Sequence, residues 1–275
     1  MIQPLATVAA LCGAVLLAGC GGGGADNQQI NQIQAKSLSY GKPGEIYIAG
    51  VYMRADMKVA TGACQNPTWS ARSTPELMLL NCTVSATGEQ PLNITGSNGQ
   101  VIYKSVITVA QPQVTMVTSL GNVVLELNPT VTPGTVNNFL AYVNSGYYNN
   151  TLFHRVNAGF VAQGGGYTAG LIKKPGQTAP IALETNKGLS NTRSSLAMAR
   201  TTAADSATSE FYINLVDNPS LDYISDDRPG YAVFGKVVLG MDVVDAIAAV
   251  PTSVVNSEIN VPITDVVIKV ALQTK

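Results

Sequence analysis

The sequence contains few residues of the types that bind metals or transfer protons. Among 275 residues there is one histidine, His154, and the four cysteines form neither a Cys-x-x-Cys pair nor a Cys/His cluster. A zinc site is therefore not expected. Charged residues make up only 12% of the chain and nearly balance, leaving a formal charge of -1. We therefore expect no binding of nucleic acid and no electrostatic attraction to an anionic membrane.

Apolar runs long enough to cross a membrane are also lacking at the N-terminus. The uncharged stretch Leu5 to Ala18 is shorter than the ~20 residues that span a bilayer. It ends in Leu17-Ala18-Gly19-Cys20, which resembles the lipobox of bacterial lipoproteins. The resemblance implies a signal peptide over residues 1–19, a diacylglycerol on the Cys20 thiol, and a periplasm-facing anchor in the cell envelope, in the outer rather than the inner membrane. Because no Lys or Arg precedes the apolar run, an ordinary secretory peptide or a mis-assigned start codon stays open as an alternative.

Two cysteines are left for the exported protein. Cys12 would leave with the signal peptide and Cys20 would be acylated, so Cys64 and Cys82 remain. A single pair in an exported protein most simply forms a disulfide, worth about 3 kcal/mol in the chain-entropy model.

The segment that follows the signal is polar and then β-prone. Residues 20–36 are rich in Gly, Asn and Gln, which predicts a flexible tether. Residues 37–111 hold short β-prone runs separated by turn residues, the clearest being Ile46–Ile48, Leu77–Leu80 and Val101–Val109. We predict a small disulfide-containing β domain of unknown function, either a spacer or a partner-binding module.

Residues 112–275 begin with the pattern of a β-hairpin. After it, the spacing of the apolar residues changes from that of a strand to that of a helix. Val114–Thr118 and Val123–Leu127 flank a turn at Gly121-Asn122. Thr132 and Pro133 are suited to begin a helix. Its apolar stripe has helical spacing, and Gly146 is placed to end it; the stripe is Val136, Phe139, Leu140 and Val143.

A second helix is predicted near Met241–Ala249, and Val266–Val270 is predicted as the final strand. Many strands with two isolated helices favour a mainly β fold, a closed antiparallel barrel with one helix over each mouth.

Several motifs in the second half occur together, in order. They are Phe153-His154-Arg155-Val156, Gly159-Phe160, Gln163-Gly164-Gly165-Gly166, Asn191-Thr192-Arg193, Ala197-Met198-Ala199-Arg200-Thr201, Asp205-Ser206-Ala207-Thr208-Ser209, Phe211-Tyr212-Ile213-Asn214, Leu221-Asp222 and Gly230 to Val237. Over about Val114 to Gln273 the chain resembles the cyclophilins, and the bacterial periplasmic branch above all. The resemblance implies an eight-stranded closed barrel with two capping helices. It also implies peptidyl-prolyl cis-trans isomerase activity on proline-containing polypeptides, without cofactor or metal; we expect a monomer.

The resemblance also implies roles for individual residues. Arg155 would be the catalytic cation, and Gln163 would orient it and bind substrate backbone. The apolar proline pocket would consist of Phe160, Val161, Tyr212 and Leu221. Ala199 would contact the peptide backbone, and Tyr231, where many eukaryotic members have His, would border the pocket.

Four positions depart from the family pattern. Val161 replaces Met, Tyr212 replaces Phe, and Ser220 replaces the Trp that contacts cyclosporin in sensitive members. Glu210, which the resemblance places among the substrate-binding residues, replaces Gln near the catalytic Arg. Its carboxylate would bond to Arg155 and hold it, draw it away from the substrate, or lie solvated at the rim of the pocket.

His154 directly precedes Arg155, so strand alternation predicts that it faces the other way and is structural. Two further functions stay open. One is a non-catalytic, chaperone-like module that binds proline peptides. The other is a structural or adhesive lipoprotein whose N-terminal domain carries the function.

Overall fold

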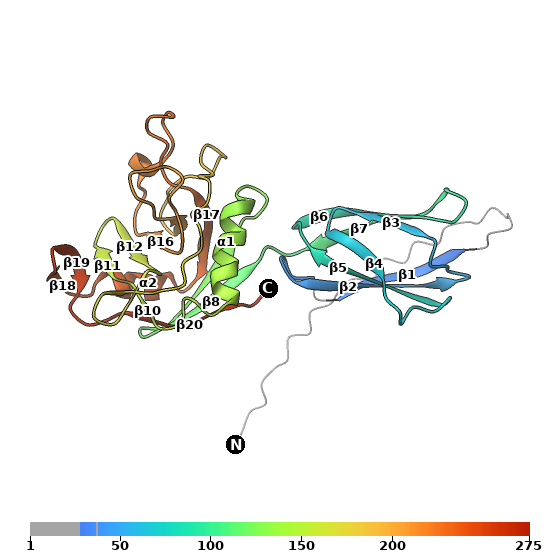
Figure 1. Ribbon diagram of the computed structural model, residues 1–275, viewed down its shortest axis with the longest axis horizontal. Coiled ribbons are helices and arrows are strands. Elements are labelled where there is room, and N and C mark those ends of the chain that lie inside the picture. The colour runs from blue at the N-terminus through green and yellow to red at the C-terminus, as the bar shows by residue number, and fades with distance from the viewer. Residues whose placement is uncertain (1–27, 37) are drawn as a thin grey trace, which may run out of the picture.

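The computed structural model describes residues 28–36 and 38–275, which form two β-rich units joined by a short connection (Figure 1). The predicted signal peptide, the predicted acylation site Cys20 and the first part of the predicted tether lie outside the described residues. In the part of the chain that the structure describes, no helix is long and apolar enough to cross a membrane.

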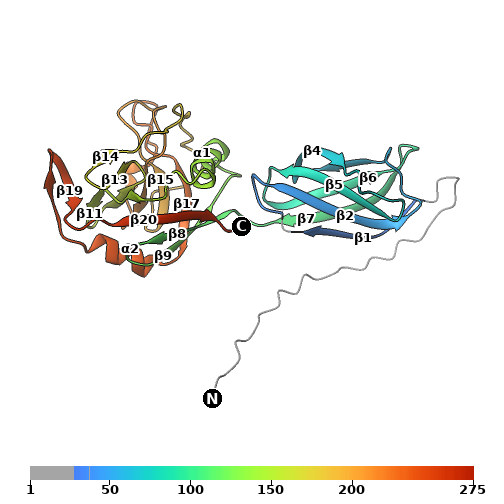
Figure 2. The same ribbon diagram turned by 60° about the horizontal axis from the view of Figure 1, so that its bottom comes forward.

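The first unit packs two antiparallel sheets face to face (Figure 2). One sheet has the order β1-β2-β5-β4 and the other the order β3-β6-β7. Their bounds are β1 Gln29–Lys36, β2 Pro43–Val51, β3 Lys58–Thr61, β4 Cys64–Trp69, β5 Leu77–Val84, β6 Gly88–Thr95 and β7 Val101–Val109. The buried core between them includes Ile46, Ile48, Met78, Leu92 and Ile94. The predicted disulfide is confirmed: Cys64 in β4 is bonded to Cys82 in β5.

Strand β1 differs from the prediction of a flexible tether. Gln29–Lys36 pairs along β2, and its Ile30 and Ile33 pack against the core of the first unit. The polar composition of this segment concealed the strand, because an edge strand needs only a few apolar contacts when its backbone hydrogen bonds are made by a neighbour.

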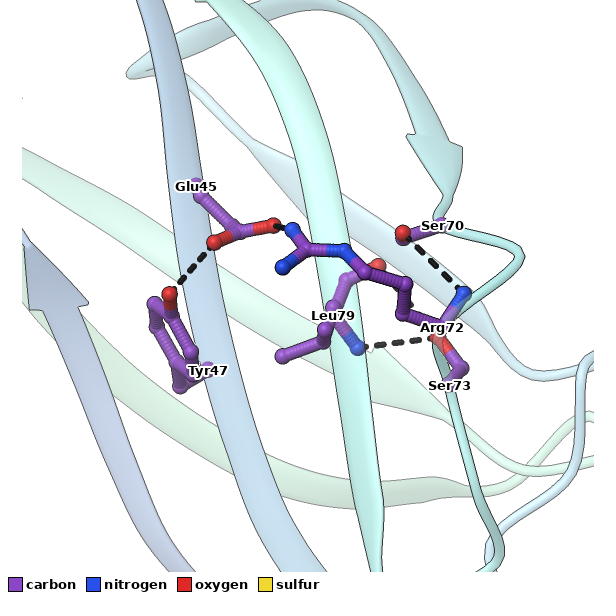
Figure 3. Close-up of polar contacts among 6 residues, drawn as sticks. All are labelled: Glu45, Tyr47, Ser70, Arg72, Ser73 and Leu79. Carbon is purple, nitrogen blue, oxygen red and sulfur yellow. Dashed lines mark hydrogen bonds and ion pairs between the residues drawn. The ribbon is translucent and has the colours of Figure 1, made fainter.

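Polar contacts tie the β4–β5 connection to the outer face of β2 (Figure 3). The Arg72 guanidinium pairs with the Glu45 carboxylate, which also accepts a hydrogen bond from Tyr47 Oη at 2.5 Å. Ser73 Oγ accepts from the Leu79 backbone N at 3.0 Å. These contacts fix the loop that follows the disulfide-bonded strand β4.

The second unit contains one long, curled antiparallel sheet. Its nine strands have the order β10-β20-β8-β9-β17-β15-β16-β12-β11. Their bounds are β8 Gln113–Thr118, β9 Asn122–Leu127, β10 Thr151–Leu152, β11 Arg155–Asn157, β12 Val161–Gly164, β15 Ser195–Met198, β16 Phe211–Asn214, β17 Val233–Leu239 and β20 Val267–Gln273. Two small hairpins accompany it, β13 Tyr167–Thr168 with β14 Ile172–Lys173, and β18 Thr252–Val255 with β19 Glu258–Pro262. A short 3-10 helix, η1, covers Pro219–Leu221.

The prediction of a closed eight-stranded barrel is wrong in detail, because the sheet has nine strands and stays open. Its edges are β10 and β11, which follow each other in the chain with only Phe153 and His154 between them. Each edge strand pairs on one side only, β10 with β20 and β11 with β12. The edges are thus connected by the chain itself and not by a ladder of hydrogen bonds.

Both helices lie where the sequence predicts them. Helix α1 covers Pro133–Asn144 and α2 covers Met241–Ala248. Their apolar faces join the inner core of the second unit, a cluster that includes Phe139, Val244 and Phe234.

The capping of α1 differs from the prediction. The Thr132 side chain makes no capping bond. Instead, the Glu184 carboxylate accepts hydrogen bonds from the backbone N atoms of Gly134 at 3.1 Å and Thr135 at 2.7 Å. A negative charge at this end also complements the helix dipole.

The two units contact each other through the loop between β1 and β2. Tyr40 of that loop is buried in the inner core of the second unit. Its backbone O accepts from Gln273 Nε2 at 2.8 Å, and Lys42 Nζ donates to Asn144 Oδ1 at 2.6 Å. The first unit is therefore docked beside the C-terminal end of α1.

Candidate active site

A single row of side chains crosses the sheet of the second unit. Arg155 on β11 is directly opposite Gln163 on β12, which is opposite Tyr212 on β16. Tyr212 is in turn opposite Ala197 on β15, and Ala197 opposite Val233 on β17. Directly paired residues of antiparallel strands project from the same face. The row therefore places a cation and an amide at one end and apolar groups at the other.

The apolar end of this row belongs to a cluster on the opposite face of the sheet from the inner core. This outer cluster buries Val161, Ala197, Tyr212 and Val233, and five partly buried residues pack against it: Phe160, Leu189, Ala199, Leu221 and Tyr231. Their neighbours along the strands, such as Ala162, Leu196 and Ile213, are in the inner core, as strand alternation requires. The five residues assigned to the proline pocket and its border thus lie in one cluster, together with Ala199.

Two cavities adjoin the row. One of about 310 Å³ lies at its polar end and is lined by His154, Arg155, Gln163, Tyr167, Leu171, Glu210, Asn256, Glu258 and Ile259. The β18–β19 hairpin forms part of its wall. The other, of about 160 Å³, is lined by Leu189, Tyr231 and Val233 of the outer cluster together with residues 184–188, Ser190, Asp222 and Tyr223.

The polar side chains at the first cavity form a continuous chain of contacts. Arg155, which is half-buried, donates from Nη1 to Gln163 Oε1 at 3.4 Å. Gln163 Nε2 donates to Glu210 Oε2 at 2.9 Å. His154 Nε2 lies 3.3 Å from the same carboxylate oxygen. Arg155 is therefore attached to Glu210 through the Gln163 amide.

Glu210 is neither solvated nor bonded to Arg155. Its side chain is only 22% exposed, and among the described residues it makes no hydrogen bond or ion pair with Arg155. Burial by itself raises the pKa of the Glu210 carboxyl, but hydrogen bonds from His154 and Gln163 and the nearby charges of His154 and Lys173 outweigh it. The pKa consequently lies below its ordinary value, so the group is ionised at neutral pH.

The prediction that His154 faces away from the site is wrong. Its side chain lines the same cavity as Arg155, and its ring packs on Tyr167 with centroids 4.6 Å apart. Strand alternation does not apply, because β10 ends at Leu152 and β11 begins at Arg155, leaving His154 in the connection.

The hydroxyl that distinguishes Tyr212 from phenylalanine has a buried partner. Tyr212 Oη donates to Asn191 Oδ1 at 2.8 Å, and burial raises the pKa of this hydroxyl far above its usual value. Asn191 Oδ1 also accepts from Asn214, which donates in addition to Ser195 Oγ at 2.8 Å. Asn218 closes the network by donating to Asn214 Oδ1 at 2.7 Å and to the Phe160 backbone O at 3.0 Å.

Sequence reasoning assigned no role to this asparagine network or to Arg200. The Arg200 guanidinium lies 4.6 Å from the centre of the Tyr231 ring, and its Nε donates to the Gly230 backbone O at 2.9 Å. Asn191, Asn214 and Arg200 fall within motifs of the family pattern, whereas Ser195 and Asn218 lie outside them. The sequence shows these positions only as polar residues within apolar or turn segments. This pattern does not reveal which residues they bond to in the folded protein.

Comparison with solved structures identifies the fold of the second unit. A Cryptosporidium parvum cyclophilin type peptidyl-prolyl cis-trans isomerase matches with a TM-score of 0.50 and 26% identity, covering 60% of this chain and 98% of that one. The same protein solved in the presence of the dipeptide Ala-Pro matches with a TM-score of 0.51 and 27% identity, over 59% and 99% of the two chains. The curled sheet is thus a cyclophilin fold.

Sequence comparison identifies the family. The model of the cyclophilin type peptidyl-prolyl cis-trans isomerases matches residues 113–271. A peptidyl-prolyl cis-trans isomerase of Acinetobacter baylyi is 50% identical over 56% of this chain and 80% of its own length. Peptidyl-prolyl cis-trans isomerase B of Escherichia coli is 48% identical over 57% and 96%. The chain belongs to the cyclophilin-type peptidyl-prolyl cis-trans isomerase family.

Proposed function

We propose that the protein accelerates rotation of Xaa-Pro bonds in exported proteins and that a lipid on Cys20 anchors it to the cell envelope. The observation that supports the activity most strongly is the row across the sheet, in which Arg155 and Gln163 lie beside the outer apolar cluster. The Cryptosporidium relative was also solved in the presence of the dipeptide Ala-Pro, which is consistent with this class of substrate.

The chemistry of the reaction explains the residue types in the row. Rotation about an Xaa-Pro bond is opposed by amide resonance, with a barrier of ~20 kcal/mol. In the twisted state the prolyl nitrogen regains lone-pair character, so a donor aimed at it stabilises that state more than the planar one. Such a difference is catalysis, and a ~10⁵-fold acceleration requires lowering the barrier by about 7 kcal/mol.

Each residue then has a defined task. Arg155 supplies the donor, and Gln163 holds it and contacts the substrate backbone. Phe160, Tyr212 and Leu221 receive the prolyl ring in the outer cluster. No bond of the substrate is broken, so the step proceeds without a nucleophile.

Refolding kinetics test this activity on a protein substrate. An exported protein whose slow refolding phase is limited by Xaa-Pro isomerisation should refold faster with catalytic amounts of the full chain. An unchanged slow phase, with the substrate nevertheless bound, would favour the non-catalytic binding module.

Anchoring makes a separate prediction. Cells that express the wild-type chain are grown with an alkyne-labelled fatty acid. Because the lipobox-like segment ends at Cys20, they should yield a labelled protein in the outer-membrane fraction. The Cys20→Ala variant should lose the label and the membrane association. The Cys64–Cys82 disulfide is consistent with an oxidising compartment. Label on the Cys20→Ala variant, or none on the wild type, would contradict the anchor.

Weak inhibition by cyclosporin is expected as well. Ser220, in the position of the drug-contacting Trp of sensitive relatives, is exposed in η1 and offers little apolar area. We expect an inhibition constant far above the nanomolar range in the isomerase assay. A nanomolar constant would show that the drug binds through other contacts.

A further inference from the structure

The hydrogen bonds at the 310 Å³ cavity assign Glu210 a task that depends on the proposed isomerase function. We propose that Glu210 is a positioning residue, which fixes the orientation of the Gln163 amide and through it the orientation of the Arg155 guanidinium. The carboxylate itself does not touch the substrate.

Donor and acceptor chemistry determines the order of the contacts. An ionised carboxylate only accepts hydrogen bonds, and a guanidinium only donates them. Gln163 lies between the two and carries one end of each kind. Its amino group must face Glu210, as it does at 2.9 Å, and its carbonyl must face Arg155, as it does at 3.4 Å. Donation to a charged acceptor also polarises the amide, which strengthens its carbonyl as an acceptor.

Glu210 is itself held in place from two sides. His154 Nε2 lies 3.3 Å from Oε2. On the other side the carboxyl group lies against the backbone of Gly166, where an added Cβ would be only 2.5 Å from Oε1 and 2.6 Å from Cδ. A residue with a side chain at position 166 would therefore displace the carboxylate.

The charged and titratable groups around Glu210 determine how pH acts on this arrangement. His154 in the β10–β11 connection, Lys173 in β14 and Tyr167 in β13 face it, and Glu258 in β19 lines the same cavity. A carboxyl with a lowered pKa stays ionised down to acid pH. The positioning effect should thus persist at neutral pH and disappear only as pH falls through the lowered pKa of the Glu210 carboxyl.

The first test replaces Glu210 and uses a matched control. In Glu210→Gln, either end of the new amide can face Gln163, so the orientation is no longer imposed. We expect kcat to fall about threefold to tenfold, the range of one hydrogen bond of this kind, with KM little changed. Glu89→Gln removes the same charge from an exposed position of β6 in the first unit, outside the cavity, and should keep the wild-type rate. Equal losses in both variants, or a faster Glu210→Gln enzyme, would overturn the proposal.

The second test displaces the carboxylate without removing its charge. Gly166→Ala should reduce kcat about as much as Glu210→Gln, and combining the two substitutions should add little, because both interrupt one interaction. Additive losses in the double variant would show that Gly166 acts independently of Glu210.

The third test is the pH profile, measured by NMR exchange so that no coupling protease is needed. The wild type should lose activity as pH falls through the lowered pKa of the Glu210 carboxyl, whereas Glu210→Gln should show no such loss. In His154→Leu the loss of activity should begin at a higher pH than in the wild type. In His154→Gln, which retains a hydrogen-bond donor, it should begin near the wild-type pH. The same acid limb in wild type and Glu210→Gln would overturn the proposal.

These outcomes are separable from failure of the proposed function. If the wild type does not accelerate exchange at any pH, the isomerase proposal itself fails. If the wild type is active and Arg155→Ala is not, but Glu210→Gln has the same activity and pH profile as the wild type, only the positioning role fails.

Discussion

Replacement of Arg155 by alanine should reduce kcat/KM on the order of 10²- to 10³-fold, the usual cost of losing one preorganised donor at a developing charge. Arg155 lies at the polar end of the row, half-buried and bonded to Gln163. KM should change much less than kcat, because the proline ring still binds to the outer cluster. A protease-coupled or NMR exchange assay measures both constants.

Arg155→Lys is the control for charge alone. A lysine is a point charge on a flexible stem and lacks the planar fork, so it should not restore the activity. Folding is checked by near-ultraviolet circular dichroism of the second unit. A correctly folded Arg155→Ala enzyme with more than a tenth of the wild-type rate would refute the assigned role.

Replacement of Asn214 by alanine should have the largest effect on stability, a decrease of about 2–4 kcal/mol in the free energy of unfolding of the second unit. Asn214 is fully buried and bonds to Asn191, Ser195 and Asn218. Alanine removes these partners and leaves a cavity behind Phe160, whose backbone O is held by Asn218.

The single tryptophan supplies an internal control for this measurement. Trp69 lies in the first unit, where it packs against that core and donates to the Met57 backbone O. Its fluorescence should report a transition that shifts much less than the one seen by tyrosine circular dichroism, because seven of the eleven tyrosines lie in the second unit. Loss of only the Tyr212 hydroxyl, in Tyr212→Phe, should cost about 1 kcal/mol. An Asn214→Ala protein as stable as wild type would contradict the importance of the network.

The sequence predicted the helices and strands that are determined by neighbouring residues in the chain. The β8–β9 hairpin and helices α1 and α2 follow from turn residues, apolar spacing and Pro133. The residues that carry the family pattern lie together because the register of β11, β12, β16 and β15 aligns them.

Features that depend on distant partners could not be predicted. Glu184 caps a helix about fifty residues before it in the chain, and Tyr40 is buried in the core of the other unit. The orientation of His154 depends on a break between two strands. Glu210 contacts Gln163 and His154, which none of the three alternatives for this carboxylate included. Such contacts are set by tertiary packing, which sequence spacing does not encode.

The exchange rate of a short Xaa-Pro peptide in the presence of the full chain tests the central claim most directly. With substoichiometric wild-type protein, NMR exchange spectroscopy should show cis-trans interconversion far faster than the uncatalysed process, which takes tens of seconds or more. The Arg155→Ala protein at the same concentration should show little acceleration. If the peptide binds to the outer cluster but its cis-trans exchange stays as slow as in buffer, the claim that this row of residues stabilises a twisted amide is contradicted.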